Sequence, residues 1–357
     1  MTNTLTEGDA VAAWGELETA LPVSVQSPRR YYHPLAEAAD TFVAEAQDSD
    51  RIFTGQPEFD AEMRGIGRGM LCMVQGYSHS GKTQWLLQLL RHNKTKRICL
   101  FIPDEPAPLV LSKLASVESN IPAKELEARI AINDQESIRL LKAIATDEFP
   151  NLAVFDQPLS AESMNGAYDE MCDVWGDEPQ LVIVDYVDLV QVGDQVGSKF
   201  EFLKAFCSKR KVPLVALHQT SRSAGRDGQK MKIDSGNYGG ETFATFVIGV
   251  RRLKAGLEAE REDLLPRVRK GSEQAADRLA EVEYDLRIHQ YTMTVNLVKN
   301  KRPGGALVDD IDMEIDQQSG RLYALNGELP SQFRDDARKL RERTMSPPPV
   351  EYTQESF

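Results

Sequence analysis

Short apolar runs alternate with longer amphipathic stretches along the chain from about residue 51 onward. The apolar runs lie at residues 70–76, 97–103, 152–158, 181–190 and 212–219. The amphipathic stretches between them lie at residues 83–93, 108–118 and 136–147. Runs of the first kind are typical of buried strands, and the apolar spacing of the second kind is typical of helices. Strands that alternate with helices predict an α/β fold, with a mostly parallel twisted sheet flanked by helices.

The second half of the chain contains further predicted strands and one segment that breaks the alternation. These strands lie at residues 243–253, 291–300 and 321–325. Residues 254–288 are rich in Glu, Arg and Ala and poor in large apolar side chains. This composition predicts a charged helical hairpin, with Pro266 and Lys270-Gly271 near its break. We interpret the hairpin as an insertion into the main domain, and its purpose stays open.

The 357 residues divide into a predicted arm, core and tail. Residues 1–50 hold nine acids and two bases, a net charge of −7, and predict an acidic N-terminal arm. Residues 51–328 form the predicted core. Residues 329–357 predict a basic helix and a disordered tail that contains a run of prolines.

Composition indicates a soluble protein of the cytoplasm. Apolar residues make up 41% and charged residues 27%, and no apolar run approaches the roughly 18 residues of a transmembrane helix. The N-terminus lacks the basic and apolar regions of a secretory signal. The four cysteines are scattered without a CxxC pair, which argues against a zinc site and a disulfide framework. We therefore expect no membrane contact.

Charge is distributed unevenly. The net charge of −13 disfavours a protein that coats nucleic acid indiscriminately. Residues 199–232, however, hold nine bases and two acids, a net charge of +7. Such a stripe fits a channel for a polyanion, and it equally fits a solvated helix face followed by a basic loop.

The segment GYSHSGKT at residues 76–83 fits the phosphate-binding pattern G-x-x-x-x-G-K-[ST] between a predicted strand and a predicted helix. Glycine at both ends lets the backbone wrap a phosphate chain, and the helix N-terminus attracts negative charge. Lys82 would reach the β- and γ-phosphates of ATP as a catalytic cation, and the Thr83 hydroxyl would bind Mg²⁺. The predicted cofactor-binding positions are Gly76, Ser80, Gly81, Lys82, Thr83, Gln84 and Asp185.

Carboxylates follow two of the predicted strands. Asp185 ends the apolar part of the run at residues 181–190, where it could hold Mg²⁺ through water, with Asp188 behind it. Asp104 and Glu105 follow the strand at 97–103. The carboxyl ends of parallel strands line the ligand crevice of an open sheet. Either of the latter two carboxylates could activate water for hydrolysis.

Taken in order, these motifs resemble the RecA-type ATPase domain of the DnaB-like hexameric replicative helicases. The resemblance covers about residues 52–325. It rests on the lead-in FTGQPEFDAEMRGIGRGMLCMVQG, then GYSHSGKT, FIPDEP, LVIVDYVDLV, LVALHQTSR, IDSGNYGGETFATFVIGVRR and VKNKRPGG. It implies a RecA-like P-loop NTPase fold, ATP and Mg²⁺ as cofactors, and a homo-oligomeric ring, expected to be a hexamer.

The resemblance also implies individual roles. Glu105 takes the place of the family's catalytic glutamate, and Gln219 that of the γ-phosphate sensor. Lys299, Lys301 and Arg302 fall in the basic segment that supplies a finger to the neighbouring subunit. The family's arginine falls opposite Lys301, and Arg302 is the better bidentate donor.

Two loops are expected to contact single-stranded DNA. They are the segments at residues 191–199 and 221–232, and neither contains an aromatic side chain that could stack on bases. Lysine and arginine there would follow the phosphate backbone without reading sequence. The candidate DNA-binding residues are Lys199, Arg222, Arg226, Lys230 and Lys232.

Three functions stay open at this point. The first is an ATP-driven, ring-forming DNA helicase for phage or plasmid replication. The second is a RecA/RadA-like recombination mediator, and the third is a regulatory P-loop ATPase without motor activity. About fifty residues precede the core, where cellular relatives carry a helical domain that meets the primase, so loader and primase partners are left open.

Overall fold

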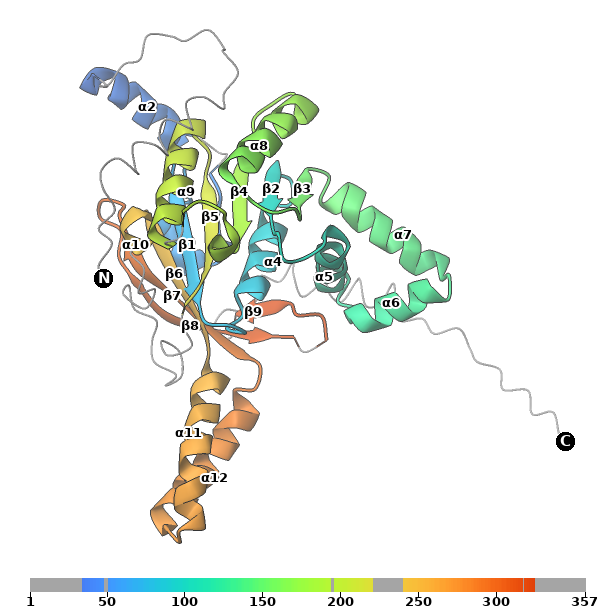
Figure 1. Cartoon of the computed structure of the whole chain (residues 1–357), viewed down its shortest axis with the longest axis vertical. Coiled ribbons are helices and arrows are strands. Elements are labelled where there is room, and N and C mark those ends of the chain that lie inside the picture. Colours follow the sequence, from blue (N-terminus) through green and yellow to red (C-terminus); the bar gives the residue numbers. More distant parts are fainter. Residues whose placement is uncertain (1–33, 48–50, 194–195, 221–239, 317, 325–357) are drawn as a thin grey trace, which may run out of the picture.

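The computed structural model describes residues 34–47, 51–193, 196–220, 240–316 and 318–324. Within these residues, nine strands form one sheet in the order β3-β2-β4-β5-β1-β6-β7-β8-β9 (Figure 1). The strands are β1 (Leu71–Gly76), β2 (Ile98–Phe101), β3 (Leu152–Phe155), β4 (Leu181–Asp185), β5 (Leu214–Gln219), β6 (Phe246–Arg252), β7 (Thr292–Asn300), β8 (Val308–Ile315) and β9 (Leu322–Ala324).

The sheet is parallel from β3 to β6 and antiparallel from β6 to β9. β1 lies between β5 and β6, and all six of its residues are buried. The carboxyl ends of β1, β2, β4 and β5 therefore meet at one edge of the sheet, which we call the carboxyl edge. The opposite end, where these strands begin, is the amino edge.

Helices cover both faces of the parallel part. α4 (Lys82–His92), α5 (Ala107–Ser119), α6 (Ala123–Ala131) and α7 (Gln135–Ala143), continued by a π-turn at Ile144–Glu148, belong to one side. α8 (Ala161–Trp175) and α9 (Val196–Arg210) belong to the other. Alternate strand residues join two separate cores: Val74 and Ile183 pack with α4 and α5, and Met73 and Val182 pack with α8 and α9. This is the three-layer α/β fold that the sequence predicts.

Short elements complete the description. They are α2 (Leu35–Gln47), α3 (Pro57–Met63), the 3₁₀ turn Val187–Leu189 and α10 (Gly240–Phe243). Among the described helices, none is both long enough and apolar enough to span a bilayer.

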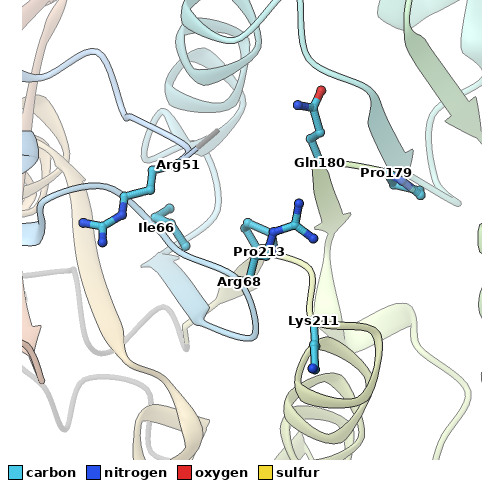
Figure 2. A pocket seen from close by; sticks show the side chains of 7 residues that line it. All are labelled: Arg51, Ile66, Arg68, Pro179, Gln180, Lys211 and Pro213. Carbon is cyan, nitrogen blue, oxygen red and sulfur yellow. The ribbon is translucent and has the colours of Figure 1, made fainter. Parts of the chain in front are cut away.

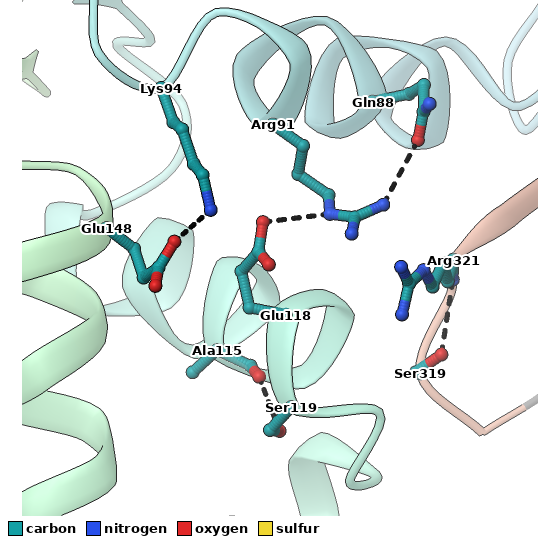
Figure 3. Close-up of polar contacts among 9 residues, drawn as sticks. All are labelled: Gln88, Arg91, Lys94, Ala115, Glu118, Ser119, Glu148, Ser319 and Arg321. Atoms are coloured by element: carbon teal, nitrogen blue, oxygen red, sulfur yellow. Dashed lines mark hydrogen bonds and ion pairs between the residues drawn. The ribbon is translucent and has the colours of Figure 1, made fainter. Parts of the chain in front are cut away.

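Polar contacts fix α4 and α5 against the turn between β8 and β9 (Figure 3). The Arg91 guanidinium donates to Glu118 at 2.8 Å, and both side chains are nearly buried at 12% and 13% exposure. The Ser319 hydroxyl donates to the Asn120 side chain at the end of α5. The helix that follows the phosphate-binding segment is thus tied to the helix that follows Glu105.

The charged hairpin consists of α11 (Leu253–Arg269) and α12 (Glu273–Ile288), which extend away from the body in Figure 1. Its chain reversal lies at residues 270–272, and Pro266 lies inside α11 instead of at the break. A small apolar cluster of Leu264, Ala275 and Val282 holds the two helices together. The predicted domain boundaries near residues 50 and 328 fall beside stretches outside the described residues and stay predictions.

The structure corrects one predicted loop. Residues 196–199 of the expected 191–199 loop form the first turn of α9, because Phe200, Leu203 and Phe206 bury one face of this helix against the sheet. Lys199 is partly buried there, and its ammonium donates to the backbone carbonyl of Asp188.

Candidate active site

The segment between β1 and α4 has the shape of a phosphate cradle. Gly81 has φ +103°, and α4 begins at the next residue, so the free N–H groups of the first helical turn face the loop. A Cβ at Gly76 would collide with the Ser80 hydroxyl and lie 2.5 Å from the Val250 carbonyl. Only glycine therefore allows this close approach of β1, β6 and the loop.

Lys82 closes the cradle. Its ammonium donates to the carbonyls of Gly76 and Tyr77 at 2.8 and 2.9 Å. Burial lowers the pKa of Lys82 to about 8, against the opposing effect of Asp185 and Asp188. The buried Ser80 hydroxyl has no hydrogen-bond partner among the described residues. A cationic donor and an unpaired hydroxyl in one glycine cradle fit a bound phosphate chain.

Tyr77, inside the loop, anchors it to the far side of β1. Its hydroxyl donates to the carbonyl of Arg252 and accepts from the N–H of the same residue, both at 2.8 Å. The side chain is only 8% exposed. Because α11 begins at the next residue, the loop and the base of the hairpin share this contact. Sequence reasoning missed Tyr77, since nothing in the motif signals a partner 175 positions away.

Acidic side chains gather beside the cradle at the carboxyl edge. Asp185 ends β4 and is 7% exposed. Burial, and then the nearby Asp104, raises the pKa of Asp185 to about 7, while Lys82 lowers it. Burial also raises the pKa of Asp104. Both Glu105 oxygens contact the ammonium of Lys113 on α5.

These side chains fit a metal ion that also binds phosphate. Within the described chain, no group of three His, Cys, Asp or Glu side chains forms a metal site by itself. Mg²⁺ held by Thr83 and Asp185 would therefore take its remaining ligands from phosphate oxygens and water, as Mg²⁺ commonly does. When bound, the ion would neutralise charge on those oxygens.

Gln219 ends β5 directly beside the first residue of the cradle. It pairs in register with Gly76, and the next N–H, of Thr220, donates to the Gly76 carbonyl at 3.1 Å. The Gln219 N–H reaches an Asp188 carboxylate oxygen at 3.4 Å. The same oxygen lies 3.3 Å from Nδ1 of His218. Although burial opposes it, hydrogen bonding from His218 and Gln219 lowers the pKa of Asp188.

The sequence model of the DnaB-like helicase C-terminal domain matches residues 52–235, half of the chain. The chain belongs to the DnaB-like helicase family. A probable replicative DNA helicase of Guillardia theta is 24% identical over 192 residues, which cover 49% of this chain and 31% of that protein. The aligned part is thus less than a third of the length of this curated relative.

Solved DnaB-like structures share the fold. A DnaB-like replicative helicase, described with its interactions with primase, superposes over 90% of this chain and 72% of its own, with a TM-score of 0.59 and 17% identity. A second solved structure, an isolated ATPase domain, superposes over 83% of this chain and 100% of its own, with a TM-score of 0.61 and 17% identity. The predicted RecA-like fold and the DnaB-like resemblance are confirmed.

The basic finger segment of this DnaB-like chain lies away from its own cradle. Asn300 at the end of β7 pairs with Phe246 at the start of β6, so residues 301 and 302 lie at the amino edge. The six residues of β1 separate the two edges by about 20 Å. Arg302 and Lys301 therefore cannot contact the nucleotide that Lys82 of the same subunit would bind.

The three finger candidates differ in their contacts. Lys299 and Lys301 donate to backbone carbonyls of α10, at Glu241 and Thr242. Arg302 donates to the Gly65 carbonyl at 3.3 Å, while its buried Nε has no partner among the described residues. Its pKa is lowered by burial and by two neighbouring arginines, Arg51 and Arg64.

A cavity at the amino edge does not form a second ligand site. It is lined by Arg51, Ile66, Arg68, Pro179, Gln180, Lys211 and Pro213. In Figure 2 the guanidinium of Arg51, that of Arg68 and the ammonium of Lys211 point in different directions. Convergent polar groups, which a small-molecule site requires, are therefore missing from this cavity.

The candidate DNA contacts are described only in part. Lys199 lies on α9 behind the 3₁₀ turn, with its ammonium bound to the chain itself. Arg222, Arg226, Lys230 and Lys232 lie outside the described residues. The DNA-binding assignments, like the other site roles, stay predictions.

Proposed function

We propose that this chain is the motor of an ATP-driven, ring-forming DNA helicase that translocates on single-stranded DNA during phage or plasmid replication in the host cytoplasm. The observation that carries the proposal is the division of the ATPase machinery between two edges of one sheet. The cradle and its carboxylates lie at the carboxyl edge, and the finger residues lie about 20 Å away at the amino edge.

Such a division supports head-to-tail assembly. A heterologous contact that joins the amino edge of one copy to the carboxyl edge of the next closes into a ring when its rotation closes. Arg302 of one subunit would then complete the nucleotide site of its neighbour. We assign the finger to Arg302 in preference to Lys301, because Lys301 is engaged by Thr242 while Arg302 keeps a buried, unpaired donor.

The exposed helix α2 also favours a neighbouring copy. None of its residues is buried, and Leu35, Phe42 and Val43 are 87%, 67% and 52% exposed. Large apolar side chains clustered on one exposed helix are typical of an interaction surface. A second copy of the chain in the ring is the cover that we propose.

Within one subunit, the roles follow from the contacts. Lys82 leaves the carbonyls of Gly76 and Tyr77 for the β- and γ-phosphates, a stronger charge-assisted partner. Glu105 orients or deprotonates the attacking water. Gln219 senses the terminal phosphate and passes its loss to the basic segment that follows β5, which tracks the DNA backbone.

The test combines two assays on the same protein. ATP hydrolysis is measured with and without single-stranded DNA, and strand separation is measured on a forked duplex. The Lys82→Ala variant is the control and should lose hydrolysis while its melting temperature is retained. DNA-stimulated hydrolysis with strand separation supports the proposal.

Other outcomes select other functions. Stimulated hydrolysis without strand separation would favour the recombination mediator, or a helicase that requires a loader; addition of candidate loader proteins separates these. Hydrolysis that DNA does not affect would favour the regulatory ATPase and would remove the pore argument.

A further inference from the structure

Glu105 has a fixed cationic partner that no motif predicts. The ammonium of Lys113 lies 2.5 and 2.6 Å from the two oxygens of the Glu105 carboxylate. The side chains are partly buried, at 22% exposure for Glu105 and 30% for Lys113. Contact with both oxygens restricts the rotation of the carboxylate more than a contact with one oxygen would.

The helix that carries Lys113 is held firmly in place. Its first N–H, at Ala107, donates to the Asp156 carboxylate at 3.0 Å. Further along, Val110 and Leu114 are buried in the core. Helical side chains lean toward the N-terminus of their helix, so Lys113 can reach back along α5 to the turn that contains Glu105.

The ammonium also compensates a concentration of negative charge. Asp104, Glu105 and Asp185 all lie near the ends of β2 and β4. Repulsion between them raises the pKa of Asp104 and of Asp185, after the larger effect of burial, while Lys113 lowers both. Without Lys113, like charges would drive Glu105 away from the cradle.

We propose that Lys113 is the positioning residue of the ATPase site: through its two contacts with Glu105 it holds the water-activating carboxylate in a single orientation at the carboxyl edge. This inference rests on the proposed function, because it requires Glu105 to act on water. It adds a residue, supplied by the helix after the catalytic turn, that contacts neither nucleotide nor metal.

The experiment replaces Lys113 by methionine and by arginine. Methionine keeps the length of the side chain and removes its charge, while arginine restores two donors. Because misplacement of a catalytic group costs one to two powers of ten in rate, kcat for ATP should fall about tenfold or more in Lys113→Met, with KM changed less than about twofold. Lys113→Arg should recover most of kcat.

Two controls separate positioning from a general structural effect. Lys142→Met changes an exposed lysine of α7 in the same way and should leave kcat unchanged. In a Glu105→Gln background, Lys113→Met should cause no further loss of kcat, because the two residues act through one carboxylate.

Several outcomes would overturn the inference. An unchanged or increased kcat in Lys113→Met would show that the ion pair is neutral or restraining. Equal losses of kcat from Lys113→Met with and without Glu105→Gln would show that Lys113 acts elsewhere. Wild-type protein that does not hydrolyse ATP would remove the proposed function itself, and this is decided before any variant is compared.

Discussion

The contact between Tyr77 and Arg252 gives a quantitative test of how the cradle is anchored. The Tyr77→Phe variant removes one hydroxyl and keeps a ring that is 8% exposed, so no cavity forms. Both lost hydrogen bonds, at 2.8 Å each, join the loop to the backbone of the last residue of β6.

The magnitude follows from these two bonds. An intramolecular hydrogen bond contributes about 0.5–1.5 kcal/mol net, so the pair contributes about 1–3 kcal/mol to the free energy of unfolding. The contact is partly buried, and water can replace part of it once the hydroxyl is gone. We therefore expect the free energy of unfolding to fall by about 1–2 kcal/mol.

Urea unfolding measures this change directly. The midpoint should decrease while the slope stays constant, since the surface exposed on unfolding is nearly the same. Tyr284→Phe makes the same chemical change at a site that is 58% exposed on the hairpin, and its effect should stay within about 0.5 kcal/mol. Equal stability of Tyr77→Phe and Tyr284→Phe would refute the anchoring role.

Three further predictions concern the two edges of the sheet. Arg302→Ala and Lys82→Ala should each abolish hydrolysis, and an equal mixture should regain about a quarter of the wild-type rate, because intact loops then meet intact arginines in a heterologous ring; a mixture that stays inactive would contradict a finger in trans. Burial raises the pKa of Asp185 from 3.8 to about 7, so the folded state binds this proton more tightly and the free energy of unfolding falls as pH rises from about 4 to about 7. The melting temperature of Asp185→Asn should therefore gain on that of wild type between about pH 5 and 8, and a constant difference would contradict this. Gly81→Ala, with φ +103° and a Cβ that would collide with the Met293 sulfur of β7, should lose nucleotide binding and more than about 1 kcal/mol of stability, whereas Gly166→Ala in open space on α8 should be neutral or stabilising by thermal melting.

The sequence predicts the layers of the fold because its apolar runs are strong and local. The strands that end at Gly76, Asp185 and Gln219 are all recognisable as short buried runs, and the structure places them side by side. β8 was missed because its pattern, VDDIDMEI, alternates acids with apolar residues and reads as a polar loop. α9 was missed because its polar first turn hides the buried aromatic face that follows.

The site could be predicted only where a motif carries it. The cradle and the acidic strand ends follow from residue types at fixed spacing, and the structure brings Lys82, Asp185 and Gln219 to one edge. The partners that orient these groups do not follow from spacing. Lys113 meets Glu105 because a helix runs back over its own start, and Tyr77 meets Arg252 because β6 lies beside β1.

The hairpin α11–α12 leaves and rejoins the sheet at paired positions. Arg252 at the end of β6 is in register with Met293 of β7, and the apolar cluster of the hairpin contains no sheet residue. It therefore behaves as an exchangeable cassette, because a two-residue Asn-Gly turn could close the same ladder in its place. A fluorescent reporter grafted there would emerge beside the residue that anchors the cradle, and would follow the loop without altering a catalytic side chain.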